Sequence, residues 1–495
     1  MRNRGFASGI GLVAGLLAVL AALLSPEAAC AAGAAGEGVP HLDGAKLGLI
    51  WDLPFVGILL SIALFPLLAP LFWHHHFGKI SAFWALAFLI PFTLTFGWQL
   101  ALFELLHVAL LEYIPFIVLL LSLFTVAGGV RLTGSLRGTP AVNTGILLLG
   151  TVLASWMGTT GAAMLLIRPV LNANSWRERK THVVVFFIFL VANIGGSLTP
   201  LGDPPLFLGF LKGVDFFWPT THMLLPMIVV AVPLLGIFYL LDSYLYRKEP
   251  EEARAANEAG GTNGEQPTKL GLEGGINILL LGGVVGAVLL SGIWKPGISF
   301  EIYHVHVELQ NNTREILLLG IAGLSLLLTS NVSRELNGLS WFPILEVAKL
   351  FAGIFITIIP AIAMLRAGTN GALAEIVRSV TKAEGEPINY MYFWATGILS
   401  SFLDNAPTYL VFFNTAGGQP AVEKLMSEWS ATLLAISAGA VFMGAMTYIG
   451  NAPNFMVRSI AEERGVKMPS FFGFMGWSIV FLVPLFVVIT FIFFI

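Results

Sequence analysis

The chain has 495 residues, of which 56% are hydrophobic and only 11% are charged. Soluble chains carry roughly 25% charged residues, so this composition excludes an ordinary soluble enzyme and indicates a polytopic membrane protein. The formal net charge of -3 argues against nucleic acid as a partner, and the single cysteine leaves no internal disulfide.

The N-terminal segment has the pattern of a secretory signal peptide. Arg2 and Arg4 precede an apolar run at 10–24, and small residues follow around Cys30. This order of basic, apolar and small residues is typical of a cleaved leader. We therefore expect residues 1–31 to be a signal peptide, with the mature chain starting outside the cytoplasm. The alternative is an uncleaved first span.

Length and apolarity locate the membrane-spanning segments, because a helix needs about 20 apolar residues to cross the hydrocarbon core. Continuous candidates lie at 50–73, 80–98, 112–129, 222–246, 276–294, 315–330, 341–365 and 470–495. Glycine and proline break two further apolar segments, 182–211 and 430–460. A short polar tip divides two others, 141–171 and 389–414, which we interpret as re-entrant hairpins.

Two stretches between the spans have weaker patterns. The segment 99–111 contains Glu104 and His107, which favours a helix at the membrane interface. The segment 298–309 alternates apolar and polar residues, which favours a short strand or hairpin outside the membrane.

The longest polar insert, 247–275, lies at the middle of the chain. It predicts a flexible cytoplasmic linker between a first transmembrane repeat at 50–246 and a second at 276–495. With this arrangement, lysine and arginine of the short loops fall mainly on the cytoplasmic side, as the positive-inside rule requires. The sequence thus predicts an all-α polytopic membrane protein with about ten crossings, five in each half, and one hairpin per half.

The two halves share two matched motifs. Residues 196–205 align with 444–453 at an offset of 248, and the hairpin tips 155–159 and 401–405 align at an offset of 246. Five crossings per half make the second repeat inverted, which is an architecture of secondary transporters. A broken helix persists inside a membrane only where its backbone is buried or lines a cavity, so these breaks predict a site.

Two carboxylates lie in the matched motifs. Asp404 lies at the second hairpin tip, and Asp203 follows Gly202 in the first break. Ionisable groups inside membrane segments are functional candidates by default. A carboxylate away from bulk water needs a proton or a cation, so each can exchange one for the other and is a tentative sodium ligand. The alternative is that each is only a helix cap.

Neutral oxygen donors accompany these carboxylates, and hard cations such as sodium prefer oxygen ligands. They are Ser155, Thr159, Thr160, Asn193, Thr199, Ser401, Asn405, Thr408, Thr447, Asn451 and Asn454. With Asp203 and Asp404 they form the predicted ion- or substrate-binding site. We expect no catalytic residue and no cofactor, only a transported or coupling cation, sodium being favoured, and protons.

Other polar residues have structural interpretations. Glu346 and Lys349 can pair at i, i+3 on one helix face, with proton coupling as the alternative. The histidines at 74–76 are interpreted as a solvated cluster at a span end, and Asp242 and Arg247 as interfacial residues beside the linker.

The motifs Asn-Ile-Gly-Gly-Ser-Leu-Thr-Pro-Leu-Gly-Asp at 193–203 and Ser-Ser-Phe-Leu-Asp-Asn-Ala-Pro-Thr at 400–408 resemble signatures of the ion transporter superfamily. This superfamily includes arsenite-efflux-like permeases, NhaD-type sodium/proton antiporters and citrate (CitMHS-like) or dicarboxylate carriers. The resemblance covers 50–495. It implies inverted repeats with sites at the tips and breaks, a homodimer in the lipid bilayer of the inner (plasma) membrane, and elevator-type movement of a transport domain past a scaffold.

Within the superfamily, the Gly-Asp after Thr-Pro and the Leu-Asp-Asn-Ala-Pro tip are more similar to the sodium/proton antiporters. Dicarboxylate carriers usually have Ser-Asn-Thr at both tips, whereas this chain has Gly-Thr-Thr at 158–160 and Asp-Asn-Ala at 404–406. An acidic tip disfavours a citrate anion unless cations bind first. The leading hypothesis is exchange of sodium or a similar cation for protons. The alternative is a cation-coupled transporter of citrate, a dicarboxylate or another anion.

Other function classes lack support in the sequence. It contains no HExxH motif, nucleophile elbow, P-loop or G-x-G-x-x-G motif, so we do not expect an enzyme. A channel is compatible with the composition, but the predicted inverted repeat favours alternating access.

Overall fold

The structure is a computed structural model that describes residues 40–134, 136–258, 271–337 and 339–495. The predicted signal peptide at 1–31 and the middle of the predicted linker lie outside these residues. The structure is 76% helical with only two short strand pairs among the described residues, which confirms the all-α fold class. Strand β1 (Arg131–Thr133) pairs antiparallel with β2 (Gly271–Glu273), and β3 (Ser299–Ile302) pairs with β4 (Val305–Glu308). The second pair confirms the strand hairpin predicted at 298–309.

The first half of the chain runs from short 3-10 turns to a long helix that leads into the predicted linker. Its helices are η1 (Gly44–Lys46), η2 (Leu49–Asp52), α3 (Leu53–Leu68), α4 (Pro70–Phe96), α5 (Trp98–Val108), the π-helix η3 (Ala109–Tyr113), α6 (Ile114–Ala127), α7 (Pro140–Met157), α8 (Thr159–Ala173), α9 (Thr181–Leu190), η4 (Ile194–Ser197), α10 (Pro204–Leu211), α11 (Trp218–Arg247) and α12 (Glu251–Glu258). The described ends of the linker therefore have regular structure, in α12 and β2.

The second half follows a similar order of long helices, a helix hairpin and a broken helix. Its helices are α13 (Ile276–Ile293), α14 (Leu309–Leu328), α15 (Asn331–Leu336), α16 (Phe342–Thr357), α17 (Ile359–Arg366), η5 (Gly368–Asn370), α18 (Ala374–Val380), α19 (Asn389–Phe402), α20 (Asn405–Thr415), η6 (Gln419–Ala421), α21 (Val422–Met426), α22 (Ser430–Met443), η7 (Gly444–Met446), α23 (Ala452–Glu463), α24 (Phe471–Phe481) and α25 (Val483–Phe493). Bends of 42° separate α16 from α17 and α24 from α25. Each bend has a proline in the first turn of the second helix, which removes a helical hydrogen bond there.

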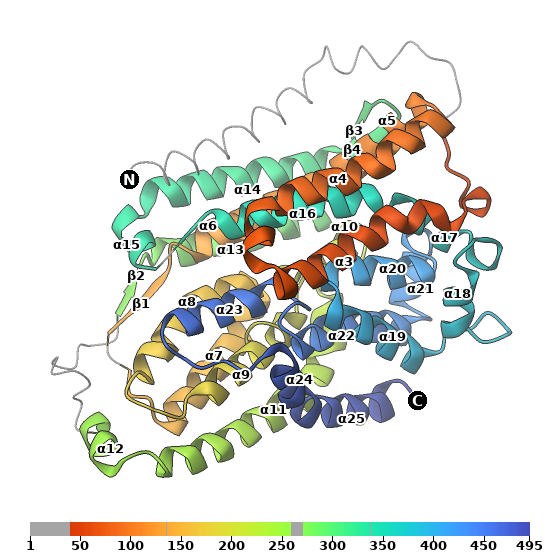
Figure 1. Ribbon diagram of the computed structural model, residues 1–495. Helices are drawn as coiled ribbons and strands as arrows, with labels where there is room; N and C mark the ends of the chain where they lie inside the picture. The colour runs from red at the N-terminus through yellow and green to blue at the C-terminus, as the bar shows by residue number, and fades with distance from the viewer. Residues whose placement is uncertain (1–39, 135, 259–270, 338) are drawn as a thin grey trace.

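Helices from both halves form two layers (Figure 1). The scaffold layer contains α3, α4, α6, α13, α14 and α16, which pack against one another. The hairpin layer contains the hairpins α7–α8 and α19–α20, the broken helices α9–α10 and α22–α23, and the helices α11, α24 and α25. Helices α8 and α10 of the hairpin layer contact α6 of the scaffold layer. Each half of the sequence therefore contributes to both layers.

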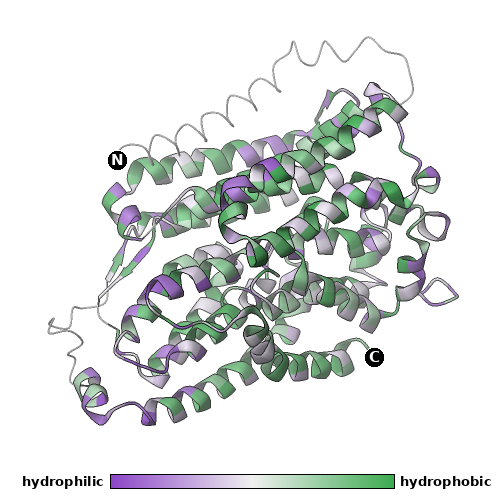
Figure 2. Cartoon of the chain, viewed as in Figure 1, coloured by the Kyte–Doolittle hydropathy of each residue, from purple (hydrophilic) through white to green (hydrophobic). Residues whose placement is uncertain are grey.

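Six of the described helices are long and apolar enough to cross a membrane, or up to nine if each bent pair counts as one span. The ten crossings predicted from the sequence also include α14 and the broken α9–α10 segment, so the number of crossings stays a prediction. Apolar residues cover the long helices, while polar residues concentrate in loops, at helix ends and on α12 (Figure 2). The described chain has the composition and helix lengths of a multi-pass membrane protein.

The helix predicted at 99–111 is present but is not separate from the next span, and its place at the membrane interface stays a prediction. Residues Trp98–Ala127 form one span of 30 residues, in which a π-helical turn joins α5 to α6. Pro115 follows this turn and cannot donate a regular backbone hydrogen bond, which favours the irregularity. Glu112 on the π-turn is buried and forms an ion pair with Lys212, which ends α10. This pair joins the scaffold layer to the hairpin layer.

Several charged residues that the sequence places in loops or at the interface are buried. Lys212 and Arg314, predicted in outside loops, are 4% and 2% exposed, and Arg314 pairs with Glu315 at 2.6 Å. Asp242, predicted at the interface, is buried and pairs with Arg177 at 2.5 Å. Because the positive-inside rule counts loop charges, only exposed cations support the predicted orientation. Among the loop cations counted from the sequence, the exposed ones on the predicted cytoplasmic side still outnumber those outside: Arg137, Arg179, Arg247, Lys248, Arg464 and Lys467 against Lys295, Arg366, Arg378 and Lys382.

Candidate functional site

Each predicted hairpin consists of two helices joined at a short tip. Gly158 joins α7 to α8 with a φ of 80°, a left-handed conformation that favours glycine. Asp404 precedes α20 and accepts a hydrogen bond from the backbone N–H of Ala406 at 3.1 Å. This contact is an N-cap, so a capping role of Asp404, the alternative interpretation from the sequence, matches the geometry.

The helix breaks predicted near 202–205 and 450–453 are present. Helix α10 begins at Pro204 and α23 at Ala452, each with a proline in its first turn. The residues before them, Asp203 and Asn451, have extended backbone, and their side chains do not cap the helices that follow. Both side chains are therefore free to make tertiary contacts.

In each break, matched glycines allow two stretches of the backbone, six residues apart, to lie in close contact. A Cβ on Gly202 would lie 2.1 Å from the carbonyl oxygen of Gly196, and a Cβ on Gly450 would lie 2.6 Å from that of Gly444. Real Cβ atoms essentially never approach closer than 3.0 Å. The common glycines of the two aligned motifs are thus explained by the same close approach in each half.

Hydroxyl groups of four predicted residues hold each tip to the break beside it. Thr199 donates a hydrogen bond to the carbonyl of Ser155, and Thr447 donates to the carbonyl of Ser401. Each threonine oxygen also accepts the backbone N–H two residues further on, at 3.2 Å. The two serine hydroxyls donate to backbone carbonyls of the breaks. Because the hydrogen atoms of these four hydroxyls already form hydrogen bonds to backbone carbonyls, the hydroxyls act by holding the backbone of the tips and breaks.

Asp203 lies where both tips and both breaks meet. Its Oδ1 accepts hydrogen bonds from the Thr159 hydroxyl at 3.2 Å and from the Asn451 amide at 3.0 Å, and its Oδ2 accepts from the Asn405 amide at 2.6 Å. The side chain is 1% exposed. All three donors are neutral, and Asp203 has no lysine, arginine or histidine nitrogen of the described residues within 4.0 Å. The carboxylate is therefore hydrogen-bonded while its charge has no ion-pair partner.

Three asparagines connect the breaks directly. Asn193 of the first break donates to Asn454 Oδ1 at 2.7 Å and accepts from the Asn451 amide at 3.3 Å. Asn454 donates at 2.8 Å to the carbonyls of Gly444 and Thr447. Unwound backbone leaves carbonyls that lipid cannot satisfy, so these asparagines stabilise the second break.

The remaining predicted donors have different surroundings. Thr408 donates to the carbonyl of Asp404 at 3.0 Å inside the same hairpin, so its proton is engaged locally. Asn405 Oδ1 is buried and has no hydrogen-bond partner among the described residues. A buried acceptor without a partner costs free energy unless a ligand or water satisfies it. Asn405 therefore offers an open oxygen on the residue that also contacts Asp203.

A cavity of about 100 Å³ lies between the tips, the breaks and the scaffold layer. Asp203, Asp404, Thr159, Thr160 and Asn451 line it from the hairpin layer. Residues of α6 and α16 line it from the scaffold layer: Phe116, Leu119, Leu120, Leu123, Phe124, Pro343, Ile344, Val347 and Phe351. This volume can hold several water molecules or a small ion with part of its hydration shell. The sequence did not predict the apolar wall, because a uniformly apolar span does not reveal which of its faces meets a site.

The cavity combines two electrostatic features. Two carboxylates line it, and the described residues of its lining include no lysine, arginine or histidine. At the same time the N-termini of α8, α10, α20 and α23 lie at the tips and breaks, and helix N-termini carry partial positive charge. No group of three or more His, Cys, Asp or Glu suited to a metal occurs within the described ranges. One or two carboxylates with neutral oxygens suit a hard cation held with water.

The predicted pair of Glu346 and Lys349 does not form. Glu346 accepts a hydrogen bond from the Trp73 indole at 3.3 Å, and the Lys349 ammonium lies 5.5 Å from the centre of the Phe77 ring. Both contacts join α16 to α4, so these residues act within the scaffold layer and away from Asp203.

Comparison with known proteins agrees with this picture. Residues 44–494 match the model of a family described as "Putative citrate transport". An uncharacterized transporter of Mycobacterium tuberculosis (strain H37Rv) is 27% identical over 384 residues, which cover 72% of this chain and 80% of that protein. A 46 kDa membrane protein of Mycobacterium leprae is 23% identical over 373 residues, with the same coverage of 72% and 80%.

Proposed function

The chain belongs to this citrate-transport family, and we propose that it exchanges sodium, or a similar cation, for protons across the plasma membrane. The family and the named relatives indicate a transporter rather than an enzyme, and the apolar helices agree with a multi-pass protein of the plasma membrane. The proposal concerns the transported ion, the coupling to protons and the movement that carries them.

The observation that carries the proposal is the uncompensated carboxylate of Asp203. It is buried between four chain segments, and its hydrogen-bond donors among the described residues are all neutral groups. A buried charge without an ionic partner is costly, so the carboxylate favours either a proton or a bound cation. A carboxylate that has taken up a proton has lost the charge that attracts a cation, so binding of the cation and binding of the proton compete. That competition is the physical basis of exchange.

The surrounding oxygens supply a coordination shell for the cation. Asp203 and Asp404 line the cavity, and Asn405, whose Oδ1 has no hydrogen-bond partner among the described residues, contacts Asp203. Oxygen ligands of this kind suit hard cations rather than soft metals. We assign direct contact with the ion to Asp203 and Asn405, a charge contribution to Asp404, and shaping of the backbone to the paired threonines and serines.

Elevator-type movement is the mechanism that fits the two layers. The hairpin layer holds the tips and breaks, while α6 and α16 of the scaffold layer close one side of the cavity with apolar residues. We propose that the hairpin layer slides along this apolar wall as one body, with the two repeats inverted relative to each other. The ion pair between Glu112 and Lys212 crosses the layer boundary and has to separate during such a movement.

A second candidate function is cation-coupled transport of citrate or another organic anion. The convergence of four helix N-termini favours it, because such ends bind carboxylate groups of substrates in transporters with broken helices. The absence of cationic side chains from the described lining means that the anion would need cations bound first. The family description agrees with this candidate.

Transport by purified protein in proteoliposomes separates the two functions. Vesicles with an internal pH indicator receive sodium, lithium or potassium chloride outside, and parallel vesicles receive radiolabelled citrate with and without sodium. Antiport predicts cation-dependent proton movement that citrate leaves unchanged. Sodium-dependent citrate uptake without cation-driven proton movement would replace antiport by the second function.

The carboxylate-to-amide variant Asp203→Asn tests the proposed site in the same assay, and Glu384→Gln is its matched control on an exposed loop. Asp203→Asn should abolish cation-driven proton movement, while Glu384→Gln should behave as the wild type. Wild-type transport by Asp203→Asn would exclude Asp203 as the exchanging group.

A further inference from the structure

A second cavity lies outside the candidate ion site, at the end of the hairpin layer that is predicted to face the cytoplasm. Its volume is about 530 Å³. Its lining comes from the segment between α8 and α9, the start of α9, the end of α11, the segment between α23 and α24, and α24. The lining residues that matter below are Arg177, Arg179, Lys180, Leu245, Lys467 and Trp477.

The cavity has an excess of positive charge. Four of the residues just named are cationic, and the acidic lining residue is Glu178. Asp242 compensates Arg177, and Glu249 lies 4.0 Å from Arg179. Lys180 and Lys467 have no carboxylate of the described chain within 4.0 Å. The Lys180 ammonium donates to the neutral carbonyl of Ser175 at 3.1 Å, so the charges of both ammonium groups remain uncompensated by the described residues.

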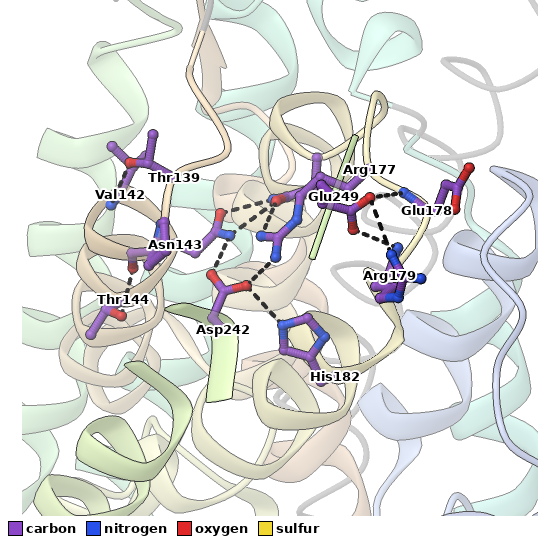
Figure 3. A network of polar contacts seen from close by, with 12 residues as sticks. Thr139, Val142, Asn143, Thr144, Arg177, Glu178, Arg179, His182, Asp242 and Glu249 are labelled. Atoms are coloured by element: carbon purple, nitrogen blue, oxygen red, sulfur yellow. Dashed lines mark hydrogen bonds and ion pairs between the residues drawn. The ribbon is translucent and has the colours of Figure 1, made fainter. Parts of the chain in front are cut away.

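A buried polar network fixes the wall of the cavity before any ligand binds (Figure 3). Asp242 of α11 accepts hydrogen bonds from the Asn143 amide at 2.9 Å and lies 2.8 Å from His182 Nε2. It also pairs with Arg177, whose buried Nε has no hydrogen-bond partner in the described part of the chain. This unused donor belongs to a residue that lines the cavity and is 2% exposed.

A second contact, seen in Figure 3, holds the loop before α9, which carries Arg179 and Lys180. Buried Glu249 accepts the backbone N–H groups of Glu178 and Arg179 at 3.2 and 2.9 Å. These bonds keep the segment before α9 in one conformation, so the cationic side chains start from a fixed backbone. Preorganisation of this kind reduces the entropy lost on binding.

We propose that this cavity binds the phosphate-bearing headgroup of an anionic phospholipid in the cytoplasmic leaflet. Basic pockets between membrane helices on the cytoplasmic side are typical sites for such headgroups. The apolar lining favours a lipid over a soluble phosphate, because Leu245 and Trp477 belong to the membrane helices α11 and α24. The same helices expose large apolar residues, among them Leu240 and Phe472, along which acyl chains can pack.

Binding is measured on the full purified chain in a zwitterionic detergent. The thermal unfolding midpoint is recorded with added phosphatidylglycerol, phosphatidylcholine or inorganic phosphate, and native mass spectrometry counts the retained lipids. Phosphatidylglycerol should raise the midpoint and remain bound, while phosphatidylcholine and phosphate should have little effect. In Lys180→Gln/Lys467→Gln the rise should fall by about half or more, together with the bound lipid.

The matched control is Lys295→Gln/Lys382→Gln, which removes two exposed lysines on the face predicted to lie outside. This variant should keep the full response to phosphatidylglycerol. An equal rise with inorganic phosphate would identify a soluble-anion site and overturn the lipid assignment. An unchanged response in Lys180→Gln/Lys467→Gln would overturn the site itself. Neither measurement depends on transport, so the outcome is separate from that of the proposed function.

Discussion

Asp203→Asn should separate the fold of the site from its affinity for a cation. The substitution keeps the side-chain volume and leaves one oxygen to accept hydrogen bonds. The new amide can replace Oδ2, where it would face the Asn405 amide across 2.6 Å. Since Asn405 Oδ1 has no partner among the described residues, the Asn405 amide can turn over and accept a hydrogen bond from the new donor. We therefore expect a stability loss of only about 1 kcal/mol, the value of one altered hydrogen bond.

The loss of cation affinity should be much larger. Two unit charges 4 Å apart attract by about 4 kcal/mol at an effective dielectric constant of 20. At 1.4 kcal/mol per tenfold change, Asp203→Asn should weaken binding by roughly three orders of magnitude. Asn451→Ala removes a neutral amide that also donates to Asp203, at 3.0 Å. Its effect on affinity should be about 1 kcal/mol, or roughly fivefold.

Sodium titration of the purified variants by calorimetry, with thermal unfolding in parallel, measures both quantities. Glu384→Gln serves as the control for removal of a carboxylate. Equal losses of affinity in Asp203→Asn and Asn451→Ala would mean that both breaks act through backbone geometry alone. Wild-type affinity in both variants would refute the reasoning and move the cation site elsewhere.

Three other predictions concern the second tip, the first break and the topology. Asp404→Asn keeps an oxygen that accepts the N-cap hydrogen bond, so the protein should fold while ion-dependent proton movement in proteoliposomes collapses. Unchanged transport with unchanged pH dependence would mean that Asp404 is only a helix cap. Gly202→Ala should destabilise the protein by about 1–3 kcal/mol through overpacking, because its Cβ must move by at least 0.9 Å, from 2.1 to 3.0 Å. A Cβ on Gly145 would have no atom of the described chain beyond its own helix within 4 Å, so Gly145→Ala should be neutral or stabilising in the same unfolding experiment. Equal losses in the two variants would contradict the close approach at Gly202. Cysteines introduced at 247–275 should react with impermeant reagents from the cytoplasmic side and those next to Ile495 from outside, and the reverse pattern would overturn the orientation.

Local sequence patterns were sufficient for the secondary structure of the site. Glycine and proline at 202–205 and 450–453 predicted where α10 and α23 begin, because proline fits a first helical turn and cannot continue a helix. The polar tips likewise predicted the hairpins, at Gly158 and Asp404. These features depend on residues within one or two turns of each other, so a single sequence contains the necessary information.

Local patterns failed where an irregularity or a distant partner decided the outcome. The π-turn at 109–113 joined two segments that hydropathy had separated, since one extra residue per turn leaves little trace in composition. The predicted Glu346 and Lys349 pair gave way to contacts with Trp73 and Phe77, because α16 packs on α4.

The sequence by itself determined that the chain is helical, suited to a membrane and interrupted at two matched pairs of positions. Only the tertiary structure decided which oxygens meet at Asp203. Its hydrogen-bond donors Asn405 and Asn451 lie 202 and 248 residues away in the chain. Spacing along the sequence carries no information about such contacts, because the packing of whole helices sets them. The same packing left the charge of Asp203 without a cationic partner among the described residues, and that is the feature on which the proposed exchange depends.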